Sequence, residues 1–144
     1  GMISMTYKNI YVAQVSLGAN PAATVKAFAE AEAYDGPAII IAYSHCIAQG
    51  FDMVMGLEHQ KMAVETGHFP LYRYNPELAE QGKNPLQLDS KAPTQSFAET
   101  ALTENRFKQL LKLNPDANAM LQKAEQKFKD NFEMLQALAN LSQS

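Results

Sequence analysis

Cysteine is almost absent from this sequence, since Cys46 is the only one in 144 residues. A single cysteine forms no internal disulfide, which excludes the class of small secreted domains held together by disulfides and fits a reducing compartment. The thiol of Cys46 is therefore free for metal binding, redox chemistry or nucleophilic attack.

Long apolar runs and an excess of basic charge are also missing. No segment approaches the roughly 20 apolar residues of a membrane helix, and the N-terminus has no charged region followed by a long apolar one. The net charge of −3 and the pI near 5.6 provide no broad positive field. We therefore expect neither a nucleic-acid nor a membrane partner, and the composition predicts a soluble, cytoplasmic protein.

The glycines are too scattered for a phosphate-binding loop. Residues 18–21 lead into a helix, but they match neither the dinucleotide pattern nor the Walker pattern. The single cysteine and the three histidines show no zinc-ligand spacing, and a thiolate cluster would need three more cysteines. The residues alone therefore indicate no complete catalytic constellation.

The chain is organised around residues 37–51. Residues 38–43 form an uninterrupted apolar run rich in isoleucine, which predicts a central parallel strand buried on both faces. In open α/β sheets, ligands and reacting groups gather beyond the carboxyl ends of strands, and Ser44, His45 and Cys46 stand at that end.

The hydrophobic patterns on either side predict a single α/β domain. A strand over 10–17, a helix over 22–34 and the strand over 38–43 form a right-handed βαβ unit, which predicts a largely parallel, three-layer fold with three to four strands. The pattern also predicts a helix over 53–66, short strands at 69–76 and 86–88, and helices over 97–113 and 116–141. Prolines bound the 69–76 strand, which favours an edge position. The α/β part is thus residues 1–95, and the helical C-terminal segment is residues 96–144.

Helical spacing predicts which side chains are buried. Val25 and Phe28 are expected to face the sheet, whereas Lys26 and Glu30 are expected to face solvent. A stripe on the last helix is expected to be buried, and it consists of Leu121, Ala124, Phe128, Leu135 and Leu138. The methionines at positions 53, 55 and 62 are interpreted as core residues.

Cys46 supports three interpretations at this point. The first is a buried structural thiol, since cysteine is among the most buried residue types. The second is a nucleophile whose pKa is lowered by the following helix N-terminus. Its base would be His59 or His68, because the side chain of the adjacent His45 points away. The third is a metal ligand. His59 taken alone is most simply a histidine on a helix surface, and His68 follows a helix end.

Four long stretches, in their order and spacing, resemble one enzyme family. They are YVAQVSLGANP, AEAYDGPAIIIAYSHCIAQG, KMAVETGHFPLYRYNP and GKNPLQLDSKAP. The resemblance is to the C-terminal part of pyruvate:ferredoxin (flavodoxin) oxidoreductases, and it is strong over residues 2–93 and looser beyond. It implies that the fold is the latter half of a thiamine-diphosphate domain.

The resemblance implies oxidative decarboxylation of pyruvate, or of another 2-oxo acid, with coenzyme A to acetyl-CoA and carbon dioxide. It implies thiamine diphosphate, Mg²⁺ and 4Fe-4S clusters as cofactors of the complete enzyme, with ferredoxin or flavodoxin as electron acceptor. In the family, three upstream cysteines and a fourth in an Ala-Tyr-x-x-Cys-Ile turn hold the cluster nearest thiamine. The fourth matches Cys46, which we therefore expect to be a metal ligand. Ala42, Tyr43 and Ile47 match the turn, whereas the family more often has proline in place of His45.

The resemblance also implies what these residues lack. The family's GDG-type motif, magnesium carboxylate and CxxC pairs belong to preceding regions, and none of them occurs here. We expect this chain alone to bind no cofactor and to be inactive, whether it is an excised piece, a split or truncated gene product, or a subunit. The expected partners are the upstream part of the enzyme and a second copy. The alternative is a free-standing, non-catalytic binding or oligomerisation module, with a cysteine hydrolase as a weaker third possibility.

Overall fold

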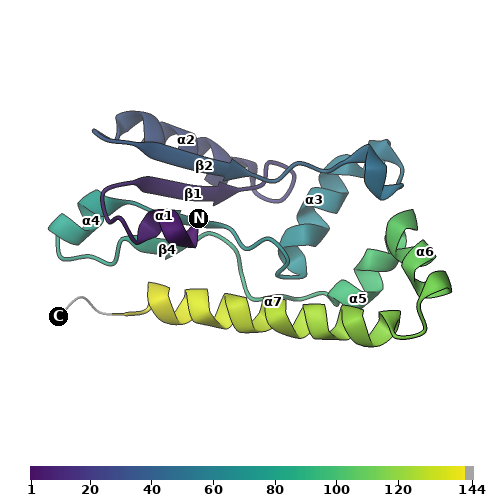
Figure 1. Cartoon of the computed structure of the whole chain (residues 1–144). Helices are drawn as coiled ribbons and strands as arrows, with labels where there is room; N and C mark the ends of the chain where they lie inside the picture. Colours follow the sequence, from purple (N-terminus) through teal and green to yellow (C-terminus); the bar gives the residue numbers. More distant parts are fainter. Residues whose placement is uncertain (142–144) are drawn as a thin grey trace.

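A computed structural model describes the fold over residues 1–141 (Figure 1). The α-helices and strands follow one another as α1 (Met2–Met5), β1 (Tyr11–Val15), α2 (Pro21–Ala33), β2 (Ala38–Ala42), α3 (Gly56–Glu65), β3 (Tyr72–Tyr74), α4 (Pro76–Glu80), β4 (Leu86–Leu88), α5 (Phe97–Thr100), α6 (Asn105–Leu113) and α7 (Ala117–Ala139). Short 3-10 turns occur at η1 (Ile47–Gln49), η2 (Met53–Met55) and η3 (Ala101–Thr103). The predicted α/β class with a helical C-terminal segment is confirmed.

The four strands form one mixed sheet in the order β2-β1-β3-β4. The β1 and β2 strands pair in parallel, whereas β3 is antiparallel to both β1 and β4, so three of the four strands run in one direction. Two expectations about position were wrong. The β2 strand is an edge strand and not a central one, and β3 is internal because its flanking Pro70 and Pro76 lie outside the three paired residues.

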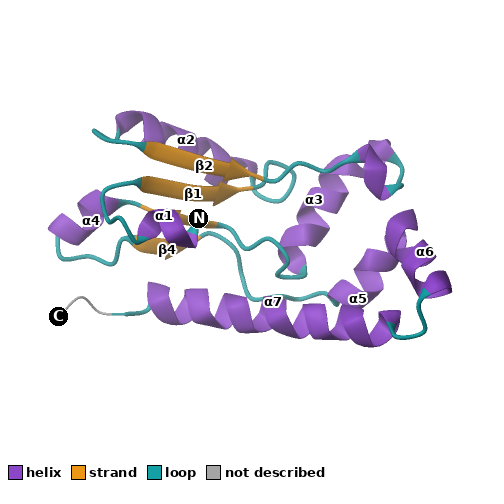
Figure 2. Cartoon of the chain, in the orientation of Figure 1, coloured by secondary structure: helices purple, strands orange, loops and turns teal. Residues whose placement is uncertain are grey.

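The sheet separates two helical layers (Figure 2). One face of β1, with Tyr11, Ala13 and Val15, packs against Ala27 of α2. The other face packs against α1 and the C-terminal half of α7, where Val12 joins a cluster with Leu135. This arrangement confirms the three-layer prediction.

Helix α2 begins where the sequence indicates, but it presents a different face to the sheet. The Asn20 side chain accepts a hydrogen bond from the backbone N–H of Ala23 at 3.0 Å, and Pro21 occupies the first turn. Val25 and Phe28 were expected to be buried, yet 68% and 54% of their surfaces are exposed. The buried face instead carries Ala27, whose small side chain lets the helix approach the sheet closely.

Arg73 of β3 holds two acidic residues from different elements. Its guanidinium donates to both Asp89 carboxylate oxygens, at 2.7 and 2.9 Å, and to Glu30 of α2 at 2.6 and 2.7 Å. Only 5% of the Arg73 surface is exposed. Glu30 was expected to face solvent, and that prediction was wrong because Arg73 binds it at the sheet surface.

The C-terminal helices keep the predicted types with one interruption. The helix predicted over 97–113 is broken into α5, η3 and α6, and α7 covers most of the predicted 116–141 helix. Leu121 and Leu135 of the predicted stripe are buried, and Phe132 joins them. Within residues 1–141, no helix is both long enough and apolar enough to cross a membrane.

Candidate functional site at the end of strand β2

The turn after β2 is held by local backbone geometry. The β2 strand ends at Ala42, Cys46 has an extended backbone, and η1 follows it directly. Gly50 closes η1 with a φ of 74°, and the Asp52 carboxylate accepts a hydrogen bond from the Val54 N–H at 3.0 Å to start η2. Cys46 therefore lies at the carboxyl end of a parallel strand, as the sequence predicted.

The thiol of Cys46 is exposed. The interpretation as a buried structural thiol is therefore wrong. Among the residues that the structure describes, no side chain forms a hydrogen bond with the thiol, and none of the three histidines is placed as its base. The nucleophile interpretation loses its geometric support, because a catalytic base must lie within hydrogen-bond reach of the nucleophile.

His45 anchors the turn to α3 and not to its neighbour Cys46. Its Nδ1 lies 3.0 Å from the Nε2 of Gln60, which makes Nδ1 the acceptor and places the ring proton on Nε2. The Oε1 of Gln60 in turn accepts a hydrogen bond from the backbone N–H of Gly18 at 2.8 Å. The ring also passes so close to Gly56 that a Cβ there would lie 2.4 Å from its Nε2. His45 thus ties the Cys46 turn to α3 and to the loop after β1.

His59 is buried, contrary to the expectation of a surface histidine. Only 9% of its surface is exposed, and its ring stacks on Phe51 with 3.7 Å between ring centroids. Its Nδ1 lies 3.6 Å from Oε1 of Glu104. Burial and the nearby His45 lower the pKa of His59, while burial raises the pKa of Glu104. Both shifts favour the uncharged forms of the two groups and so disfavour a charged pair.

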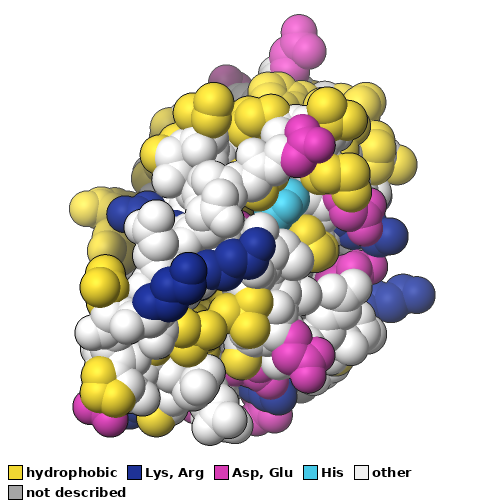
Figure 3. Space-filling model, turned by 90° about the vertical axis from the view of Figure 1, so that its right-hand side faces the viewer, with side chains coloured by type: hydrophobic (Ala, Val, Ile, Leu, Met, Phe, Trp, Pro, Cys, Tyr) yellow, Lys and Arg dark blue, Asp and Glu magenta, His cyan; other side chains and the backbone are white. Residues whose placement is uncertain are grey.

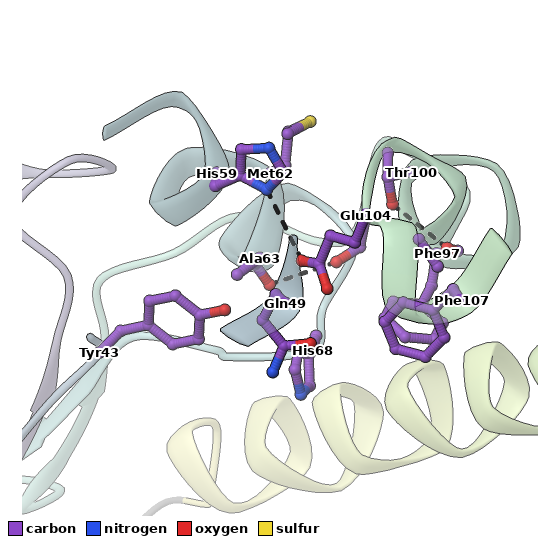
Figure 4. Close-up of a pocket in the computed structure, with 12 residues that line it drawn as sticks. Tyr43, Gln49, His59, Met62, Ala63, His68, Phe97, Thr100, Glu104 and Phe107 are labelled. Atoms are coloured by element: carbon purple, nitrogen blue, oxygen red, sulfur yellow. Dashed lines mark hydrogen bonds and ion pairs between the residues drawn. The ribbon is translucent and has the colours of Figure 1, made fainter. Parts of the chain in front are cut away.

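A small pocket of about 100 Å³ lies between α3 and the C-terminal helices (Figure 4). Tyr43 extends toward it from the end of β2, and the pKa of its hydroxyl is raised by burial and by Glu104. The side-chain amide of Gln49 bridges two residues of the C-terminal segment. Its nitrogen donates a hydrogen bond to Oε2 of Glu104 at 3.0 Å, and its oxygen accepts one from Nη1 of Arg106 at 3.2 Å. Phe97 and Phe107 are among the side chains that line the pocket.

His68 belongs to the aromatic wall of this pocket. Its ring stacks on Phe128 of α7 with 4.9 Å between centroids, and Phe97 approaches its edge at 5.5 Å. His68 follows the end of α3, as the sequence predicted, and its ring joins that end to the last helix. The sequence analysis missed Gln49, Gln60 and Glu104, because each acts through a partner that is distant in the chain.

Comparison with known proteins places these residues in a wider context. No protein-family model matches the chain. The pyruvate-flavodoxin oxidoreductase of Nostoc sp. is 54% identical over 141 residues, which is 97% of this chain. The pyruvate:ferredoxin oxidoreductase of Moorella thermoacetica is 46% identical over 140 residues, and the pyruvate-flavodoxin oxidoreductase of Rhodospirillum rubrum is 40% identical over 144 residues.

The chain is homologous to one segment of pyruvate-flavodoxin oxidoreductases. The resemblance inferred from the four sequence stretches is thereby confirmed. The matched segment is 12% of the length of each of these three relatives. Its assignment to their C-terminal part stays a prediction.

The surface of this chain around Cys46 is apolar. Figure 3 shows hydrophobic side chains gathered over the end of the molecule that carries α3 and α6. The turn and the start of α3 expose several large hydrophobic side chains, which we call the turn patch: Ile47, Met53, Val54, Met55 and Leu57. The prediction that Met53 and Met55 are core residues was wrong, because 41% and 48% of their surfaces are exposed.

This chain has one cysteine thiol, and its described residues provide no complete metal site. Within residues 1–141, no group of three or more histidine, cysteine or acidic side chains could hold a metal ion. A 4Fe-4S cluster takes about four cysteine ligands. An exposed thiol at the end of a strand fits one of these four positions, provided that the others come from another polypeptide segment.

Proposed function

We propose that this chain is a segment of an enzyme that oxidatively decarboxylates pyruvate to acetyl-CoA and carbon dioxide. The complete enzyme passes electrons through 4Fe-4S clusters to flavodoxin or ferredoxin, and this chain is inactive alone. The proposal is supported by relatives whose names give pyruvate as substrate and flavodoxin or ferredoxin as electron partner. The homodimer and the cytoplasmic location expected for the complete enzyme are part of the same proposal.

In the proposed enzyme, Cys46 is one of the four thiolates of the cluster nearest to thiamine. The observation that carries this role is the exposed, unpartnered thiol in a turn that matches the family's ligand turn. Thiamine diphosphate supplies the carbanion chemistry when bound, and the clusters carry single electrons away. The matched segment does not supply the remaining thiolates, which must come from the rest of the enzyme.

The other residues of the turn act by position. The hydrogen bond between His45 and Gln60 holds the turn against α3, and the Cys46 thiol on this turn is exposed. The turn patch places apolar groups beside the thiol. Solvent exposure is one of the factors that set the reduction potential of a cluster, so covering this patch in the complete enzyme would keep water from the cluster.

The experiment that tests this proposal is complementation in two pieces. The Nostoc oxidoreductase is expressed without the matched segment and is mixed with this chain under anaerobic iron and sulfide reconstitution. We expect pyruvate-dependent reduction of flavodoxin by the mixture and none by either piece. With Cys46→Ala in this chain, we expect loss of one cluster signal by electron paramagnetic resonance and at least tenfold slower flavodoxin reduction.

Ser44→Ala is the matched control, because Ser44 is exposed on the same turn and bonds only to the neighbouring His45 carbonyl. It should leave the cluster signal and the rate of flavodoxin reduction within twofold. A full cluster signal in Cys46→Ala would overturn the ligand assignment. Stoichiometric iron bound to this chain alone would overturn it as well.

A further inference from the structure

The start of α6 contacts the turn that follows Cys46 through its backbone. The N–H of Asn105, the first residue of α6, donates a hydrogen bond to the carbonyl of Gly50 at 3.0 Å. Gly50 has a φ of 74°, and a Cβ there would lie 2.9 Å from Cβ of Asn105. Glycine permits both this conformation and this close approach. Two segments that are distant in the sequence are therefore joined directly beside the turn.

Glu104 directs its carboxylate at the turn and not at its own helix (Figure 4). An acidic N-cap residue normally accepts a hydrogen bond from a backbone N–H of its helix. Glu104 is the N-cap residue of α6, yet within residues 1–141 its side chain accepts no such bond. Its Oε2 accepts instead from the side-chain nitrogen of Gln49 at 3.0 Å, and its Oε1 lies 3.6 Å from Nδ1 of His59. Only 17% of the side chain is exposed.

Gln49 connects Glu104 to Cys46. The backbone N–H of Gln49 donates to the carbonyl of Cys46 at 3.0 Å, which is the hydrogen bond that begins η1. The side-chain amide of the same residue is held by Glu104 and by Arg106. A single intervening residue therefore links the start of α6 to the backbone of Cys46.

The backbone on either side of Cys46 is thus tied to a different helix. The preceding residue, His45, is bonded to Gln60 of α3 at 3.0 Å. On the following side, Gln49 is bonded to Glu104 at the start of α6. Side chains that are supported by helices are held more precisely than those supported by loops. The turn is thereby fixed from two directions.

We propose that Glu104 is a positioning residue for the cluster that Cys46 binds in the complete enzyme. The inference rests on the proposed function, in which Cys46 is one of four thiolates. Groups that support a metal ligand from behind set its orientation, and their loss typically costs about 10- to 100-fold in metal affinity or activity. Glu104 acts on the backbone of Cys46 through Gln49.

Loss of this support should change the reduction potential of the cluster. Hydrogen bonds and solvent exposure are among the factors that set this potential. A turn released from α6 admits water to the cluster, and water stabilises the negative charge that reduction adds. We therefore expect Glu104→Ala to raise the potential. Glu104→Gln removes the negative charge but keeps a side-chain oxygen that accepts from Gln49, so this pair of variants separates position from charge.

Amide hydrogen exchange in this chain alone tests the first step. The amides of Gln49 and Asn105 are both bonded at the turn, and the Tyr11 amide, which is bonded within the sheet, is the internal reference. We expect Glu104→Ala to speed exchange at Gln49 and Asn105 at least tenfold relative to Tyr11, and Glu104→Gln to change it less than threefold. NMR reads each amide separately. This measurement requires no cluster and is independent of the proposed function.

A redox titration of the complete enzyme tests the second step. The Nostoc oxidoreductase carries this chain in place of its matched segment, and electron paramagnetic resonance follows each cluster. We expect Glu104→Ala to change the reduction equilibrium of one cluster at least tenfold, which is about 59 mV for one electron. Glu104→Gln should stay within threefold. Glu99→Ala is the matched control, because Glu99 is an exposed acidic residue of α5 in the same C-terminal segment, and it should also stay within threefold.

A double-mutant cycle shows whether the effect passes through Gln49. Gln49→Ala breaks the same contact from the side of the turn, so it should shift the potential in the same direction. The double variant Gln49→Ala/Glu104→Ala should shift it no further than the larger single change, because residues in one hydrogen-bond network are not additive. Circular dichroism checks that the variants are folded. If Glu104→Ala is not folded, Gln49→Ala and Glu104→Gln decide.

Three results would overturn the inference. Equal shifts in Glu104→Ala and Glu104→Gln would assign the effect to charge. Additive shifts in the double variant would show that Glu104 does not act through Gln49. An unchanged potential in Glu104→Ala, together with loss of the cluster signal in Cys46→Ala, would reject the positioning role and sustain the proposed function. A full cluster signal in Cys46→Ala would reject the proposed ligand itself, and with it the inference.

Discussion

Arg73 and Asp89 form a two-pronged ion pair across the β3–β4 hairpin. The Nε of Arg73 donates to Oδ2 of Asp89 at 2.7 Å, and its Nη2 donates to Oδ1 at 2.9 Å. The remaining Nη1 binds Glu30 of α2, so one guanidinium joins the hairpin to a helix of the βαβ unit. This arrangement holds the antiparallel half of the sheet to the parallel half, which carries the Cys46 turn.

Replacement of Arg73 by alanine should destabilise the fold strongly. The substitution leaves Asp89 and Glu30 without their shared cation, and removal of one partner of a buried ion pair costs about 3–5 kcal/mol. Urea unfolding measures the loss. Lys26→Ala is the control, because Lys26 also approaches Glu30, at 3.9 Å, but is 59% exposed, and exposed pairs contribute under about 1 kcal/mol. Equal losses in the two variants would contradict the role of Arg73.

Replacement of Gly67 by alanine tests the packing at the end of α3, and the same replacement at Gly82, which follows α4, is its control. Both have a left-handed backbone, with φ of 73° and 70°, so alanine costs about 1–2 kcal/mol at either position. A Cβ at Gly67 would also lie 2.6 Å from Cγ of Pro93, whereas nothing lies within 4 Å of one at Gly82. We expect thermal unfolding to show a loss of free energy at least 1 kcal/mol larger for Gly67→Ala, roughly the cost of overpacking.

Glu125 should make the free energy of unfolding of the C-terminal segment depend on pH. Hydrogen bonds from Lys129, Ser96 and the backbone N–H of Ala98 lower its pKa from 4.5 to about 2. Because the folded state favours the carboxylate, this stabilisation is complete above pH 4.5 and is lost as pH falls toward 2.

Glu125→Gln should therefore cost roughly 1 kcal/mol at pH 7, since the group is near solvent, and nothing near pH 2. Unfolding by urea across this pH range measures the difference, with Glu133→Gln on the exposed face of α7 as the control. A loss for Glu125→Gln that does not change with pH would show that the charge is not its cause.

The elements of this fold were predictable because they depend on local sequence. The Asn20-Pro21 start of α2 and the apolar run of β2 are local signals, and both elements form where they were expected. The position of a strand in the sheet depends instead on its partners. The apolar run of β2 predicted two neighbouring strands, yet among residues 1–141 β2 pairs with β1 alone.

The candidate site divides in the same way. The strand-end position of Cys46 followed from the β2 pattern, whereas the environment of His59 did not. His59 stands between Glu58 and Gln60, which favours a solvated helix face, but Phe51 and Glu104 cover its ring from other segments. Glu104 is the N-cap residue of α6, and the sequence around His59 gives no sign that the two residues meet.

Cys46 should behave as an accessible thiol without an activating base. The thiol is exposed, and within the described residues His45, His59 and His68 make their contacts with Gln60, Glu104 and Phe128. We expect iodoacetamide to alkylate native Cys46 at a rate within threefold of that for the urea-unfolded chain at the same pH. His59→Gln and His68→Gln should leave the native rate within twofold, because neither ring reaches the sulfur. A native rate raised tenfold or more, and lost in one of these variants, would identify a base and restore the hydrolase interpretation.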